Sequence, residues 1–108
     1  MSFCVIMSTA SGMDEAKKLA RLLLESRAAA CVTAIPALSI YRWKGKILEE
    51  EEVLTIAKTT EEKASLAEEV IIRNHSYEVP EILVLSVASG SQSYLEWVRA
   101  EVSGDVAE

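Results

Sequence analysis

The chain has 108 residues and half of them are hydrophobic, so it fits one domain with a sizeable core, spanning residues 1–108, and leaves no room for a second. Its 17 acidic and 11 basic residues give a formal charge of -6, and no basic run longer than Lys17-Lys18 opposes that field, which argues against nucleic acid as a partner. Its two cysteines are separate and form no disulfide framework, so we expect a reduced protein. Its apolar N-terminal run is too short for a membrane span or a signal peptide. We therefore expect a cytoplasmic protein without a membrane partner.

The first predicted elements are a strand and a helix. Residues 3–7 form a short continuous apolar run, which is typical of a central strand. Ser11 then stands three residues before Asp14, a spacing that indicates a capping box and the start of a helix. Apolar side chains recur along this helix at spacings of three and four and predict that it covers one face of a sheet; they are Ala16, Leu19, Ala20, Leu23 and Leu24.

Residues 31–58 predict a long antiparallel hairpin. The first arm, residues 31–42, is rich in β-branched and aromatic residues, and the second arm, residues 47–58, has the same character apart from four glutamates at 49–52. Between the arms, Gly45 supplies the glycine that a short hairpin turn usually needs. Pro36 and the glutamate run are the two features that could kink or bulge the arms.

The rest of the chain completes the fold class. Thr59 and Glu62 repeat the capping-box spacing and predict a second helix that ends near Asn74. Residues 82–87 predict an internal fourth strand, and residues 94–102 predict a third helix ahead of a frayed tail at 103–108. The order predicts an α+β, ferredoxin-like βαββαβ domain, in which a four-stranded antiparallel sheet carries an extended hairpin between its second and third strands, two helices on one face and a C-terminal helix.

The predicted hairpin is longer than the domain that carries it. Arms of a dozen residues at ~3.3 Å each reach ~40 Å, whereas a compact domain of this length is roughly 34 Å across. Tyr41, Trp43 and Leu48 near its tip would then be exposed to water, together with unpaired strand edges. We therefore expect an oligomer that covers this surface.

His75, the only histidine, falls between a helix end and a strand start, and its role has two interpretations. It either makes structural hydrogen bonds there or serves as a metal ligand or proton-transfer group. Tyr77 and Glu78 likewise either hold a tight loop together or line a pocket. Cys4 and Cys31 either pack as small hydrophobes or offer soft ligands, with His75 as a partner. Cys4, Cys31 and His75 stand far apart in the sequence, without the short spacing of a metal motif, so folding or assembly would have to bring them together.

The glutamate run at 49–52 is interpreted as a solvated segment that discourages edge pairing, with binding of a hard cation as the alternative. Catalysis has no comparable signal, because the sequence contains no glycine-rich phosphate loop, no nucleophile elbow and no Ser/His/Asp set. A nucleophile pair of Cys31 and His75 is formally possible, but nothing in the sequence orients it. We expect a protein that is not an enzyme and has no obligatory cofactor.

Six motifs follow one another between residues 3 and 102. They are RAAACV at 27–32, SIYRWKGK at 39–46, EVL at 52–54, IAKT at 56–59, HSYEVPEI at 75–82 and YLEW at 94–97. Together they resemble the CutA family, the divalent-cation-tolerance proteins. The sequence departs from the family's usual pattern at Thr33 in place of asparagine, at Ala37 in place of glycine and at Ser76 in place of proline, and Gly90-Ser91 replaces a glycine-asparagine turn.

The resemblance implies a ferredoxin-like subunit in a stable homotrimer held by its long hairpins, a cytoplasmic location, a response to copper and other divalent metal ions, and no established reaction. By position it implies that Cys31 and His75 are metal ligands for copper. It also implies an aromatic and acidic pocket at the clefts between subunits, whose members are Trp43, Tyr77, Glu78 and Tyr94.

Three functions therefore remain open. The first is a trimeric metal-binding or metal-responsive protein. The second is a signalling trimer, similar in architecture to PII-like proteins, that binds a small effector in the intersubunit pocket. The third is a scaffold whose protein partner supplies the function.

Overall fold

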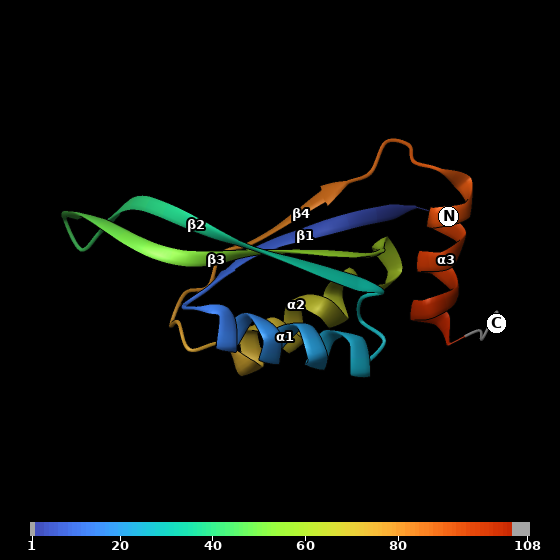
Figure 1. Cartoon of the computed structure of the whole chain (residues 1–108), viewed down its shortest axis with the longest axis horizontal. Coiled ribbons are helices and arrows are strands. Elements are labelled where there is room, and N and C mark those ends of the chain that lie inside the picture. Colours follow the sequence, from blue (N-terminus) through green and yellow to red (C-terminus); the bar gives the residue numbers. More distant parts are fainter. Residues whose placement is uncertain (1, 105–108) are drawn as a thin grey trace.

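The computed structural model of the chain describes residues 2–104, which form one four-stranded sheet and three helices (Figure 1). In chain order the elements are β1 (Phe3–Ala10), α1 (Met13–Glu25), β2 (Cys31–Trp43), β3 (Lys46–Thr60), the short 3-10 turn η1 (Glu61–Lys63), α2 (Ala64–Asn74), β4 (Ile82–Ser86) and α3 (Gln92–Ser103). The strands lie in the order β2-β3-β1-β4 and every neighbouring pair is antiparallel. The predicted ferredoxin-like α+β fold is confirmed.

Two helices cover one face of the sheet, and Figure 1 shows α1 and α2 on the same side of it. Cys4 and Ile6 of β1 are each 1% exposed beneath them, whereas Val5 and Met7 point to the opposite face and are half-buried. Because side chains alternate along a strand, one face of β1 enters the core and the other does not. The core cluster on the helix side also contains Leu23 of α1.

The hairpin of β2 and β3 is confirmed and continuous. Its register runs without interruption from Cys31 opposite Lys58 to Trp43 opposite Lys46, so neither Pro36 nor the glutamate run breaks it. Pro36 is tolerated because β2 is an edge strand, where a missing N–H donor can face away from the ladder.

A two-residue turn closes the hairpin. Lys44 and Gly45 have φ angles of 50° and 81°, which fits the type I′ turn that matches the twist of paired strands. β1 ends at Ala10, opposite Val53 of β3, and the hairpin continues beyond it by a further roughly 20 Å as a two-stranded ribbon. The described residues accordingly extend over 48 × 26 × 22 Å, so the predicted overhang is confirmed.

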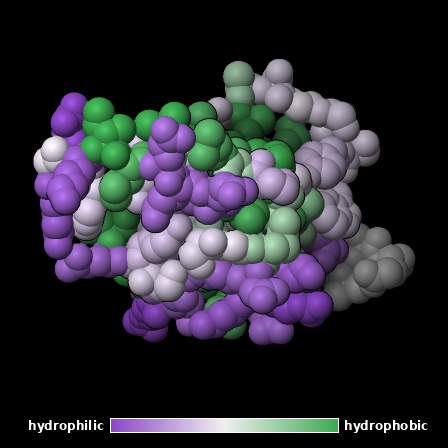
Figure 2. Space-filling model, turned by 60° about the vertical axis from the view of Figure 1, so that its left-hand side comes forward, coloured by the Kyte–Doolittle hydropathy of each residue, from purple (hydrophilic) through white to green (hydrophobic). Residues whose placement is uncertain are grey.

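The sheet face opposite α1 and α2, which we call the open face, is apolar and has no helix over its central part (Figure 1). Ile35, Leu83 and Leu85 lie on this face with 44%, 54% and 43% of their surfaces exposed. Figure 2 shows hydrophobic residues gathered on the sheet side of the molecule and hydrophilic ones on the helix side. An apolar sheet face of this kind is typical of a surface that another protein chain covers.

Both predicted capping boxes are wrong. The N-cap of α1 is Gly12, which has no side chain to accept hydrogen bonds from the first turn, and the carboxylate of Glu15 instead accepts a hydrogen bond from the Ser11 N–H at 2.8 Å. Thr59 remains in β3, where its hydroxyl donates to the carbonyl oxygen of Ala28 at 2.7 Å. Pairing with β1 holds β3 as far as Thr60, so Thr59 belongs to the strand and does not cap the second helix.

The predicted internal position of the fourth strand is also wrong. β4 is the second edge of the sheet, and Leu83, Val84 and Leu85 are all exposed in the single chain.

α3 begins after Ser91, whose hydroxyl accepts a hydrogen bond from the Tyr94 N–H. The helix lasts through Ser103, one residue into the predicted frayed tail; the end of that tail, 105–108, lies outside the described residues.

Candidate functional site

His75 joins the loop after α2 to the end of β1. Its side chain is 0% exposed, and its Nε2 lies 2.7 Å from the carbonyl oxygen of Thr9, while its Nδ1 lies 3.0 Å from the N–H of Tyr77. A carbonyl can only accept and an N–H can only donate, so these partners select the neutral imidazole with its proton on Nε2. Both ring nitrogens are therefore occupied by structural hydrogen bonds.

Glu15 holds the same loop from the side of α1. Its carboxylate accepts hydrogen bonds from the N–H of Ser11 at 2.8 Å and from the N–H of Ser76 at 2.7 Å. Burial by itself would raise the pKa of Glu15, but these hydrogen bonds outweigh it and lower the pKa to about 2. A carboxylate ionised throughout the physiological range therefore ties the start of α1 to the residue after His75.

Where the hairpin extends past β1, it forms a groove of about 660 Å³ together with the loop at 75–81. Three of the four predicted pocket residues, Trp43, Tyr77 and Glu78, line this groove. Tyr41, Glu50 and Glu52 of the hairpin line it as well and were not predicted as site residues. The fold thus brings together an aromatic and acidic cluster from the hairpin and the loop after α2.

Two tyrosine–carboxylate hydrogen bonds organise this groove. The hydroxyl of Tyr77 donates to Glu52 Oε2 at 2.6 Å, and the hydroxyl of Tyr41 donates to Glu50. Burial, the hydrogen bond and the nearby carboxylates raise the pKa of Tyr77, and the hydrogen bond to Glu50 is the main cause that raises the pKa of Tyr41 to about 12. Both phenols therefore remain protonated donors at neutral pH.

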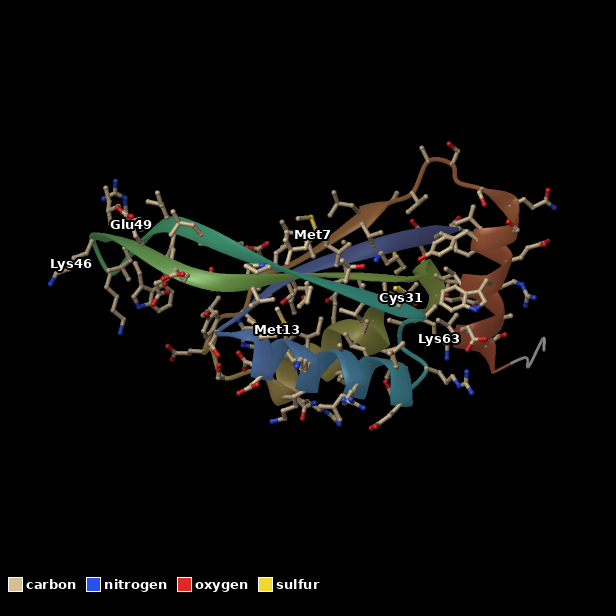
Figure 3. The ribbon with its side chains drawn as sticks, in the orientation of Figure 1. Met7, Met13, Cys31, Lys46, Glu49 and Lys63 are labelled. Carbon is tan, nitrogen blue, oxygen red and sulfur yellow. The ribbon has the colours of Figure 1, made fainter. Side chains whose placement is uncertain are left out.

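Cys31 lies at the other end of the sheet, near α3, while Lys46 and Glu49 mark the distant hairpin tip (Figure 3). Its thiol is half-buried on the open face, with Lys58 Nζ 3.8 Å from Sγ. Tyr94, the fourth predicted pocket residue, belongs to this end rather than to the groove: burial, and after it the neighbouring Cys31, raises the pKa of Tyr94. Cys4 is buried under the helices and acts as a core residue.

The two predicted metal ligands are not brought together within one chain. Cys31 is in register with Lys58 and Val5, whereas His75 contacts Thr9, four residues further along β1, which is roughly 13 Å at ~3.3 Å per residue. Among residues 2–104, no three His, Cys, Asp or Glu side chains converge to hold a metal ion. Any ion shared by Cys31 and His75 would need side chains from different subunits.

Among the site residues that the sequence analysis missed, Tyr41 and Glu50 follow from the hairpin register. With Lys44-Gly45 as a two-residue turn, Tyr41 lies opposite Leu48 and diagonal to Glu50, a distance that an aromatic side chain spans. That signal was present in the sequence, because the turn alone determines the pairing. Glu15 carried no such signal, since its partner Ser76 lies 61 residues away.

No helix within residues 2–104 combines the length and the apolar character that crossing a membrane requires.

Comparison with known proteins gives concordant results. The family described as CutA1 divalent ion tolerance protein matches residues 4–101. The divalent-cation tolerance protein CutA of Thermus thermophilus is 41% identical over 88% of this chain and 93% of that protein. The chain spans about half the length of some curated plant and animal relatives, with 53% of the Arabidopsis thaliana protein and 48% of the human one covered.

Solved structures agree with the sequence relatives. The crystal structure of CutA from Xylella fastidiosa superposes with a TM-score of 0.92 at 34% identity and covers 94% of this chain and 99% of that one. A structure described as the periplasmic divalent cation tolerance protein CutA from Archaeoglobus fulgidus superposes with a TM-score of 0.91 at 34% identity, covering 93% of this chain and 98% of that one. By fold and by sequence along almost its whole length, this chain belongs to the CutA1 divalent ion tolerance protein family.

Proposed function

We propose that the protein is a non-enzymatic homotrimer of the divalent-cation-tolerance type that works in the cytoplasm and binds copper or another divalent metal ion. The names of its relatives support the link to divalent cations. The observation that carries the proposal is the apolar open face, which ends in the half-buried thiol of Cys31. A trimer closes this face and brings copies of that thiol under the cover of neighbouring subunits.

Cys31 is the soft ligand in this proposal. A thiolate favours Cu(I) and other soft or borderline ions, and Cys31 is the more accessible of the two cysteines. One thiolate does not complete a metal site, since such ions are held in proteins by two or more ligands, four in structural zinc sites. The remaining ligands therefore come from neighbouring subunits, and Lys58, now beside the sulfur, moves aside when the ion binds.

His75 is the second proposed ligand, and it carries a structural cost. One of its two hydrogen bonds, to Thr9 or to Tyr77, has to open before a ring nitrogen can bind an ion. Because Ser76 stands where the family usually has proline, the backbone after His75 is less restricted in φ, which favours such a movement. Metal binding at His75 would then loosen the loop that borders the groove.

Equilibrium dialysis of the reduced protein against Cu(I) tests the metal proposal. We expect copper uptake by the wild type and by Cys4→Ala, a matched control that removes the buried thiol, and a loss of uptake in Cys31→Ala. His75→Ala should weaken uptake if the histidine is a ligand. Equal uptake by the wild type and a Cys31→Ala, His75→Ala double variant would overturn the proposed site.

A second function, binding of a small effector, is supported by the groove. Trp43, Tyr77 and Glu78 lie together in it, and clefts of this size and mixed polarity are common ligand sites. In this proposal, Tyr94 reaches the groove from a neighbouring subunit. A thermal-shift screen of metabolites in the presence of a chelator tests it, because a ligand that binds the folded state raises Tm without any metal; a screen without a single shift would count against it.

A further inference from the structure

We propose that the groove between the hairpin and the loop at 75–81 binds an elongated organic cation, of the linear polyamine class. This inference rests on the second function proposed above, effector binding in the groove, and names the class of ligand. Four properties of the groove lead to it: the sign of its charge, a buried carboxylate with a free oxygen, aromatic walls and the spread of its acidic groups.

The charge of the groove has one sign. Its ionisable lining consists of four glutamates and two tyrosines, and no lysine, arginine or histidine lies among the lining residues. The glutamates are Glu50, Glu52, Glu78 and Glu81. Clefts lined by one sign of charge concentrate ligands of the opposite sign, and this one therefore attracts cations and repels anionic metabolites.

Glu52 gives the groove a buried anionic group. Its residue surface is only 7% exposed, and the hydroxyl of Tyr77 satisfies Oε2, but no hydrogen bond to Oε1 exists among residues 2–104. A buried carboxylate is normally balanced by a cation or by several donors, because losing water is costly for a charge. An ammonium group at Oε1 would supply both the charge and the missing donor.

The walls are aromatic and suit an organic cation. Trp43 and Tyr41 both line the groove, so their rings border any ligand bound in it. Lys44 already places its ammonium nitrogen 5.9 Å from the centroid of Trp43, which shows that a cation can approach this ring. Cation–π attraction of this kind favours alkylammonium groups, whose methylene carbons also pack on the rings.

The spread of the carboxylates selects between a metal ion and an extended cation. A single ion needs several oxygen ligands within a few Å of one point, and no such convergence of three acidic groups exists within residues 2–104. A groove of about 660 Å³ instead has room for a chain of several amines that meets the carboxylates one after another. Glu50 and Glu52 are two residues apart on one strand, so they lie on the same face about 7 Å from each other.

Isothermal titration calorimetry with spermidine at low ionic strength tests the inference. The wild-type protein should bind spermidine, and Glu52→Gln, which keeps the shape and can still accept from Tyr77, should weaken the affinity by about tenfold. The matched control is Glu51→Gln, which removes the same charge from the neighbouring residue of β3 but points to the opposite face, away from the groove. If Glu52→Gln fails to fold, Glu78→Gln on the exposed loop takes its place.

The outcomes separate the ligand class from the proposed effector site. The inference is supported if the wild type binds spermidine, Glu52→Gln lowers the affinity, and Glu51→Gln changes the affinity by less than twofold. Equal weakening in both variants means non-specific attraction to an acidic protein and overturns it. The third outcome is that spermidine does not bind but a metabolite raises the Tm of the wild type and not that of Trp43→Ala. This result overturns the cation class, while effector binding in the groove stands. Absence of any ligand in both experiments overturns the two together.

Discussion

The Nε2 atom of His75 lies 2.7 Å from the carbonyl oxygen of Thr9, a residue 66 positions earlier in the chain. This hydrogen bond closes the end of β1 against the loop that follows α2, and the N–H of Tyr77 completes the arrangement by donating to Nδ1. The histidine that a sequence motif suggests as a metal ligand is, in the single chain, the residue that fixes the position of the groove.

The variant His75→Ala should lower the free energy of unfolding by about 1–3 kcal/mol, because Thr9 and Tyr77 each lose a buried hydrogen-bond partner. Urea denaturation measures this loss. Val79→Ala in the same loop is the matched control, since 67% of that residue's surface is exposed. A loss in His75→Ala no larger than that in the control would contradict the structural role.

Glu15 should make stability depend on acid pH. Its pKa is about 2 in the folded protein, whereas an unperturbed glutamate has a pKa of 4.5, so the unfolded state binds a proton first as the pH falls. The stabilisation is complete above about pH 4.5, is lost between about 4.5 and 2, and amounts to at most about 3 kcal/mol. Denaturation curves measured at several pH values should show this loss in the wild type but not in Glu15→Gln.

The control for this pH effect is Glu25→Gln, an exposed change on the same helix, which should keep the wild-type pH dependence. Identical pH profiles for the wild type and Glu15→Gln would mean that Glu15 does not hold the loop.

Gly45 should be required by the hairpin turn. Its φ of 81° lies in the left-handed region, where a Cβ atom is unfavourable, so Gly45→Ala should lower the free energy of unfolding by about 1 kcal/mol. Lys44→Asn at the neighbouring position, where φ is 50°, should leave stability unchanged or raise it, because asparagine tolerates this conformation. Thermal unfolding compares the three proteins; an unchanged Tm in Gly45→Ala would argue against the type I′ turn.

The sequence was sufficient for the fold because its periodic signals are local. The apolar run along residues 3–7, the helical stripe that includes Leu19 and Leu23, and the glycine of the hairpin each depend on nearby residues only. The overhang followed from the hairpin's length, and the structure has it.

The site could be predicted only in part. Trp43, Tyr77 and Glu78 do share the groove, but the sequence carried no indication that Glu52 meets Tyr77 across 25 residues, since that contact depends on the path of an irregular loop. The position of Tyr94 beside Cys31 depends on how α3 docks, which periodicity does not specify. The two capping-box predictions were wrong because a Ser or Thr three residues before an acidic residue also occurs where a strand ends. At both positions the contacts in the folded protein, and not this spacing, determine which hydrogen bonds form.

The open face should mediate assembly. Leu85→Lys places a charge on the apolar face of β4, so we expect it to dissociate the oligomer to a mass near the 11.8 kDa of one chain. Light scattering after size exclusion measures the mass. Ile72→Lys on α2, where the side chain is 59% exposed on the helix side, is the control and should leave the mass unchanged. An effect of Ile72→Lys alone would move the interface to the helices.

Native mass spectrometry of the reduced protein equilibrated with Cu(I) tests the proposed metal-binding trimer most directly, because one spectrum reports both the assembly and its bound metal. We expect a species of three times the 11.8 kDa chain mass that carries copper in the wild type and in Cys4→Ala, and the same trimer without copper in Cys31→Ala. A wild-type protein that is monomeric, a trimer that carries no copper, or copper retained in full by Cys31→Ala would contradict it.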